Sequence, residues 1–271
     1  ISVLQGLGRE VGAALVSDKR VQFVSFTGSV ETGRAILRAT AERLAKVSIE
    51  SGGKNALVVC DDADLERAPA DPSAAAFVDG GQRCAAASRI IIFDRVYEEF
   101  KRIFLEKVER LKVGVAENDD YGAIINVKRM AAILAAVRGA SGRGAKILCG
   151  GKRLADAAHK NGWFIAPTVM EDVDPSDMIS QEELFGPVVN LYKVKNFDEA
   201  VWLVNAVPFK LTAAIHTANI HRAQEFIRQC QAGVVRVNGP THGSEPQVPF
   251  GGPGLSGNGW REPGTKALDF Y

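Results

Sequence analysis

Short apolar segments alternate with longer amphipathic segments along the whole chain. Seven apolar segments have the length and the β-branched or aromatic composition of strands: 21–26, 56–60, 89–93, 145–150, 187–194, 211–216 and 233–238. Most of them are apolar throughout instead of alternating, which is typical of strands that are covered on both faces of a sheet.

Helical patterns separate these strands. They occupy the segments 9–17, 30–43, 64–77, 95–111, 127–140, 197–205 and 219–231. In the fourth of them, apolar residues recur at Tyr97, Phe100, Phe104 and Val108, which is the spacing of one helical face. Strands that alternate with helices favour parallel pairing through helical crossovers. The sequence therefore predicts an α/β fold with open, mostly parallel sheets and helices on both faces.

Composition narrows the class of protein. The 271 residues are 46% hydrophobic and 24% charged, with a net charge of +1, which is ordinary globular usage. The sequence contains no basic block and no long apolar run, so we expect neither a nucleic-acid partner nor a membrane span. The chain does not begin with methionine and has no recognisable signal peptide, so we expect a piece of a longer cytoplasmic protein.

The four cysteines have spacings that fit neither a zinc site nor a disulfide framework, so we expect no metal and a reducing compartment. Cys60 and Cys149 end strand-like segments and Cys230 ends a helical one, and all three are interpreted as buried packing residues. Cys84 differs, because small residues surround it in "FVDGGQRCAAASR" (77–89). Nearby positive groups or a helix start would favour its thiolate, although a small core cysteine is the alternative.

Two further segments carry candidate chemistry. "FTGSVETGRAI" (26–36) places a Thr-Gly-Ser turn between a strand and a helix, where free backbone N–H groups suit a phosphate. An ordinary helix cap by Ser29 is the alternative. "VSIESGGKN" (47–55) ends a strand with Glu50 and then turns on two glycines. A partly desolvated carboxylate there suits a general base, and a solvated turn glutamate is the alternative.

Taken together, these segments resemble the aldehyde dehydrogenase superfamily. Residues 49–55 match its glutamate signature, and residues 77–84 match its cysteine signature, Phe-x-x-x-Gly-Gln-x-Cys. Three other segments are similar to family segments and follow in the family's order: "FTGSVETG" (26–33), "EELFGPVV" (182–189), and "PFGG" with "SGNG" (249–259). The resemblance implies an aldehyde dehydrogenase catalytic domain with part of a Rossmann-like cofactor domain.

The resemblance also implies roles for individual residues. Cys84 would attack the aldehyde carbonyl, and loss of hydride to NAD or NADP would turn the thiohemiacetal into a thioester. Glu50 would activate water to release the carboxylic acid, so the enzyme would not transfer its acyl group to coenzyme A. The cofactor would be held at the pyrophosphate by Gly28, Ser29 and Gly33, and at the nicotinamide ribose and ring by Glu183 and Phe185. Phe250 would line the aldehyde tunnel.

The chain lacks several parts of the family pattern. The early strands of the cofactor domain, the Pro-Trp-Asn segment and the final strand that joins a partner subunit do not occur in it. We therefore expect a partial cofactor-binding domain at 1–52, a catalytic domain at 53–252 and a segment at 253–271 that returns to the cofactor domain. The full protein would be a homo-oligomer, either dimer or tetramer, and the isolated chain would be inactive. Asp79 and Gly254 depart from common family residues and leave the aldehyde open. A cofactor-independent thiol esterase or hydrolase and a non-catalytic structural relative are the alternatives.

Overall fold

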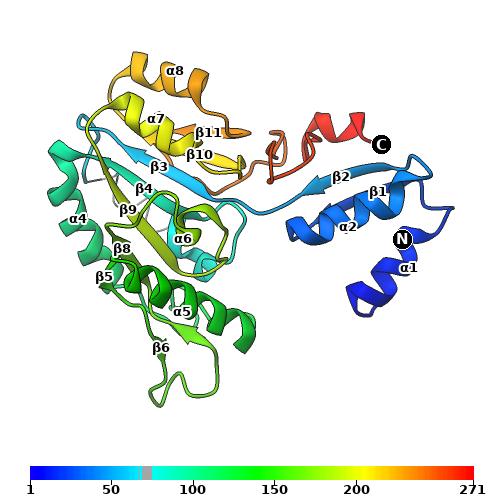
Figure 1. Ribbon diagram of the computed structural model, residues 1–271, viewed down its shortest axis with the longest axis horizontal. Coiled ribbons are helices and arrows are strands. Elements are labelled where there is room, and N and C mark those ends of the chain that lie inside the picture. Colours follow the sequence, from blue (N-terminus) through cyan, green and yellow to red (C-terminus); the bar gives the residue numbers. More distant parts are fainter. Residues whose placement is uncertain (67, 69–74) are drawn as a thin grey trace.

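The computed structural model describes residues 1–66, 68 and 75–271. The chain forms a larger lobe around a seven-stranded sheet and a smaller lobe around two strands, and both termini lie in the smaller lobe (Figure 1). None of the helices in this described part combines the length and the apolar character that a membrane span requires.

The smaller lobe is built on one parallel strand pair. Strand β1 (Phe23–Thr27) leads through helix α2 (Val30–Ala41) into strand β2 (Lys46–Glu50), and Thr27 lies opposite Glu50. Ile36, Val47 and Ile49 form its buried core. A π-helical turn, η1 (Gly8–Gly12), and helix α1 (Ala13–Ser17) precede β1, so the predicted helices in 9–17 and 30–43 are confirmed.

The larger lobe contains a sheet in the order β11-β10-β3-β4-β9-β8-β5. Every neighbouring pair is parallel except β5 and β8. The strands are β3 (Asn55–Val59), β4 (Ala87–Phe93), β5 (Lys146–Cys149), β8 (Thr168–Glu171), β9 (Val188–Val194), β10 (Thr212–His216) and β11 (Val234–Val237). A small antiparallel pair, β6 (Arg153–Leu154) and β7 (Phe164–Ile165), stands apart from it. All seven predicted strands are present, whereas β6, β7 and β8 were missed because segments this short show no clear periodicity.

Helices cover both faces of the large sheet, as predicted. Helix α4 (Asp94–Glu109) packs on one face, where Tyr97, Phe100 and Phe104 join one core cluster. Helices α5 (Val127–Gly142), α7 (Phe197–Asn205) and α8 (Ile220–Gln229) belong to the cluster on the other face. Short helical turns complete the fold: η2 (Val78–Gly81), α6 (Met178–Gln181) and η3 (Thr265–Asp269). The predicted helix 64–77 lies partly outside the described residues, and residues 75–77 are helical.

Two of the cysteine predictions need correction. Cys60 is buried as predicted, but Cys149 and Cys230 are only half-buried. Strand β5 is an edge strand, so Cys149 lies at the margin of the sheet, where its thiol points to the carbonyl of Pro167 at 3.6 Å. Cys230 caps the end of α8 and lies beyond the buried face of that helix.

The last part of the chain returns to the smaller lobe and lies beside β2 (Figure 1). The amide of Ser51 donates to the carbonyl of Ser256 at 2.8 Å, and the amide of Ile49 donates to Asn258 Oδ1 at 2.9 Å. Farther on, the ring of Phe270 packs edge-on against Phe23 of β1. Residues from the two ends of the chain thereby form one packed unit around β2.

Candidate active site

Glu50 ends strand β2 at the point where helix α2 begins. The amide of Gly28 donates to the carbonyl of Glu50 at 3.0 Å, and the side chain of Ser29 caps α2 by accepting from the amide of Thr32. A methyl group added at Gly33 would lie 3.0 Å from Ile49 Cγ2, so this glycine lets α2 pack closely on β2. The exposed helix start and the carboxylate therefore share one edge of the small sheet.

Gly52 and Gly53, which follow Glu50 after Ser51, bring three candidate residues together. A methyl group at Gly53 would collide with the backbone carbonyl of Cys84, and one at Gly52 would collide with the carboxylate of Glu183. The amide of Gly53 also donates to Glu183 Oε1 at 2.9 Å. The connection from β2 to β3 thus passes between the cysteine loop and Glu183, and only residues without a side chain fit there.

The cysteine loop is fixed by side chains that the sequence analysis did not single out. Asn55 Nδ2 donates to the carbonyls of Cys84 and Ala86 at 2.8 and 2.9 Å, while its Oδ1 accepts from the amide of Thr212. The hydroxyl of Thr241 donates to the carbonyl of Ala85 at 2.8 Å. Asn55 is the last residue of the glutamate signature, so its position was a reason to consider it as a site residue. Thr241 lies in a long glycine- and proline-rich segment that provided no such reason.

The environment of Cys84 contradicts one expectation from the sequence. Burial and then the charge of Glu183 raise the pKa of the Cys84 thiol, and a hydrogen bond from the Ala85 amide opposes them only in part. Arg83, the residue before Cys84, pairs with Asp79 at 3.5 Å. The alanine run leads into strand β4 instead of opening a helix. The sulfur therefore needs a base or a positive group beside it before it can act as a thiolate.

Glu50 has the electrostatics of a general base. Burial raises its pKa to about 8, Arg261 opposes this shift, and Glu262 adds to it. Both carboxylate oxygens are buried and accept no hydrogen bond from the described residues. The alternative of a solvated turn glutamate is therefore wrong. A carboxylate that titrates near neutral pH can take a proton from water under physiological conditions.

The remaining candidates lie around the same point. Burial raises the pKa of Glu183, and the hydrogen bond from Gly53 opposes this. Phe185, which has a left-handed φ of 54°, lines a small pocket of about 20 Å³ together with Gly53 and Glu183. Phe250 exchanges two backbone hydrogen bonds of 3.0 Å with Glu262, the residue whose charge acts on Glu50. Nowhere in the described part of the chain do three or more His, Cys, Asp or Glu residues form a group that could hold a metal ion.

Known proteins are similar to this chain in sequence and in fold. The sequence matches the Aldehyde dehydrogenase family over residues 1–271. The chain belongs to this family. It is 38% identical to the alpha-ketoglutaric semialdehyde dehydrogenase of Bacillus subtilis and 39% identical to the 2,5-dioxopentanoate dehydrogenase of Saccharolobus solfataricus. These alignments cover 100% of this chain but only 56% and 57% of those relatives, so the chain spans about half their length.

Solved structures of aldehyde dehydrogenases have the same fold. The betaine aldehyde dehydrogenase of Staphylococcus aureus, in complex with NAD+, superposes with a TM-score of 0.94 at 34% identity, over 98% of this chain and 53% of that one. A 3,6-anhydro-L-galactose dehydrogenase in complex with NAP gives a TM-score of 0.95 at 36% identity, over 99% of this chain and 56% of that one. The predicted fold class and the resemblance to the family are confirmed.

Proposed function

We propose that the enzyme containing this chain oxidises an aldehyde to a carboxylic acid with NAD or NADP. One observation carries the proposal. The Gly52–Gly53 connection places Glu50, whose pKa is about 8, next to the loop of the cysteine signature. Family membership supports the same chemistry, because the curated relatives are named as dehydrogenases of aldehydes.

In this proposal Cys84 acts as the nucleophile and Glu50 acts as the general base. The thiol of Cys84 loses its proton as the sulfur bonds to the aldehyde carbon, and the carbonyl oxygen takes up a proton to give a thiohemiacetal. Removal of a hydride from the carbon and of the hydroxyl proton would then leave a thioester on Cys84. Glu50 takes a proton from water as the water oxygen attacks the thioester carbon. The carbon–sulfur bond then breaks, the acid leaves, and the thiol is restored. The carboxylate of Glu50 argues for water as the acyl acceptor.

The exposed start of α2 fits a dinucleotide. Gly28 and Ser29 are exposed there, and the first amides of a helix suit a pyrophosphate. In this proposal Gly28, Ser29 and Gly33 form the pyrophosphate side, Glu183 binds the nicotinamide ribose hydroxyls, and Phe185 packs beside the ring. When bound, NAD or NADP supplies the hydride acceptor. Two structural neighbours were solved with NAD+ and NAP, which supports either cofactor.

The arrangement of the chain follows from the same proposal. We assign 1–52 to part of the cofactor-binding domain, 53–252 to the catalytic domain and 253–271 to the returning segment, which supports β2 through Ser256 and Asn258. We further propose a homo-oligomer, dimer or tetramer, which light scattering tests. The four cysteines are all free thiols, which supports work in the cytoplasm.

The aldehyde is proposed from the curated relatives. Two of them are named for alpha-ketoglutaric semialdehyde and 2,5-dioxopentanoate, so an aldehyde that also carries an oxo-carboxylate is the first substrate class to test. Phe250 would line the path of this aldehyde. It exchanges backbone hydrogen bonds with Glu262, whose charge acts on Glu50.

The experiment uses the protein made from the complete reading frame. It is given NAD or NADP and a panel of aldehydes, and reduced nicotinamide and acid are measured. We expect Cys84→Ala to abolish turnover and Cys149→Ala to retain it, because Cys149 lies at the far edge of the sheet. The isolated chain should produce no reduced nicotinamide. Normal turnover of Cys84→Ala refutes the proposal, and ester cleavage without nicotinamide in a protein that oxidises no aldehyde supports the hydrolase alternative.

A further inference from the structure

Gly251 separates the carboxylate of Glu50 from the guanidinium of the half-buried Arg261. A methyl group added at Gly251 would collide with Glu50 Oε1 and would lie 3.1 Å from Arg261 Nη1. Both charged atoms therefore lie close to the position of this one missing side chain. Gly251 has a φ of 139°, which side chains rarely adopt, so the backbone there already excludes other residues.

Two more glycines complete the enclosure around this pair. A methyl group at Gly233 would lie 2.7 Å from Arg261 Nη1, and one at Gly257 would lie 3.5 Å from Glu50 Oε1. Gly233 directly precedes β11, Gly251 lies in the loop that follows β11, and Gly257 lies in the returning segment. Their missing side chains leave room for one carboxylate and one guanidinium.

Neither charged group obtains its hydrogen bonds elsewhere in the described part of the chain. Both oxygens of Glu50 and Nη1 of Arg261 are buried without a hydrogen-bond partner there. A buried charge without compensation costs several kcal/mol, so two opposite charges in one small space stabilise each other. The other charge that acts on Glu50 is Glu262, whose carboxylate accepts from the hydroxyl of Ser25 at 3.1 Å, and Glu50 itself acts on the thiol of Cys84.

We propose that Arg261 is the positioning residue of Glu50: it attracts the carboxylate into the space at Gly251 and favours its ionised form for the attack of water on the thioester. Arg261 is the positive group that acts on Glu50, whereas Glu262 is an acid and acts in the opposite direction. The inference rests on the proposed function, because it assigns Glu50 the role of base. It adds a residue that acts through Glu50 without touching the substrate.

The test compares Arg261→Gln with Arg261→Lys in the protein made from the complete reading frame. The pH profile of the acid-releasing step is measured, with thermal unfolding to verify the fold. Loss of the guanidinium charge leaves Glu50 protonated to higher pH, so the acid limb of the profile should move upward by about 1 pH unit or more. Arg261→Lys keeps a positive charge on a group of different shape. The acid limb of its pH profile should therefore move upward by less than that of Arg261→Gln.

Controls separate this inference from the proposed function. Arg228→Gln makes the same chemical change at an exposed position on α8 and should leave the profile unchanged. If Glu50→Gln still releases acid at the parent rate, the proposed function itself fails. If Glu50→Gln is inactive but the folded Arg261→Gln enzyme keeps the parent's acid limb, the role of Arg261 alone is overturned. Should Arg261→Gln not fold, an unshifted profile in Arg261→Lys overturns it equally.

Discussion

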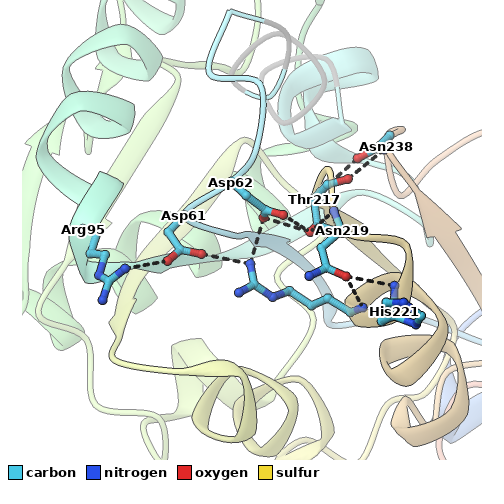
Figure 2. A network of polar contacts seen from close by, with 8 residues as sticks. Asp61, Asp62, Arg95, Thr217, Asn219, His221 and Asn238 are labelled. Atoms are coloured by element: carbon cyan, nitrogen blue, oxygen red, sulfur yellow. Dashed lines mark hydrogen bonds and ion pairs between the residues drawn. The ribbon is translucent and has the colours of Figure 1, made fainter.

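Two groups of polar side chains lie at opposite ends of the parallel strands in the larger lobe. Cys84 and Glu183 precede β4 and β9, whereas Asp61, Asp62 and Thr217 follow β3 and β10. In the second group, Arg222 Nη1 donates to both aspartates at 2.9 and 2.8 Å, and the hydroxyl of Thr217 donates to Asp62 (Figure 2). Asn219 and Asn238 extend the network to α8 and β11, and Arg95 links it to α4.

The difference between the two groups lies in how their charges are satisfied. The network of Figure 2 pairs its aspartates with an arginine and a hydroxyl, and it connects β3, β10, β11, α4 and α8. At the other end, the oxygens of Glu50 accept no hydrogen bond from the described residues, and glycines stand where side chains would collide. A fully satisfied network stabilises the fold, whereas unpartnered buried groups cost stability and are typical of reactive sites.

The position of the candidate site also differs between the two sheets. Ligands of open α/β sheets usually bind outside the carboxyl ends of the strands. Glu50 and the start of α2 obey this rule in the small sheet, but Cys84 precedes β4 of the large sheet. The site therefore lies between the carboxyl ends of one sheet and the amino ends of another, and Gly52 and Gly53 form the passage.

The strongest way to break this arrangement is Gly53→Ala. The added methyl would collide with the carbonyl of Cys84 and lie 2.6 Å from Asn55 Oδ1, so the cysteine loop must move. Because a shift of about 1 Å at a reacting group costs about 100-fold in rate, we expect at least this loss of turnover. Gly142→Ala is the control, since a methyl there meets nothing within 4 Å. Equal turnover in both folded variants would show that the Gly52–Gly53 segment can accept a side chain without displacing the cysteine loop.

The network at the opposite end should affect stability and not chemistry. Arg222→Ala leaves Asp61 and Asp62 without their shared donor, so we expect the free energy of unfolding to fall by about 2 kcal/mol. Turnover of the folded protein should stay at the parent value. Arg95→Ala removes a 3.4 Å contact from an 80% exposed side chain and should change stability by less than about 0.5 kcal/mol. A loss of turnover in folded Arg222→Ala would contradict the separation of the two regions.

The sequence could predict strands, helices and short motifs, which depend on local patterns. It could not predict which residues from distant segments pack against the site. The apolar segments predicted every long strand, and the two signatures predicted that Glu50 and Cys84 belong to one site. Arg261 and Thr241 reach that site from the far end of the chain, and no local pattern encodes how distant segments pack against it. The raised pKa of the Cys84 thiol could not be predicted for a similar reason, because its burial and the charge of Glu183 both depend on tertiary contacts.

The smallest expected effect concerns the free energy of unfolding that is lost because the Glu50 carboxylate is buried. Its pKa rises from 4.5 to about 8 on folding, so between these values the folded protein holds a proton that the unfolded chain has lost. The contribution of Glu50 to the free energy of unfolding is therefore largest below pH 4.5 and decreases as the pH rises from 4.5 through about 8. Glu50→Gln cannot ionise, so its free energy of unfolding should exceed that of the parent at alkaline pH and approach it at acid pH.

We expect a difference of about 1 kcal/mol between the two pH limits, because Glu50 is partly exposed and solvent screens part of the full shift. Denaturant unfolding of both proteins at the two limits measures it. Glu117→Gln, the same change at an exposed position, should show no pH-dependent difference in this range. If Glu50→Gln follows the parent at every pH, then the carboxylate is not strained by its burial, and the contrast with the satisfied network disappears.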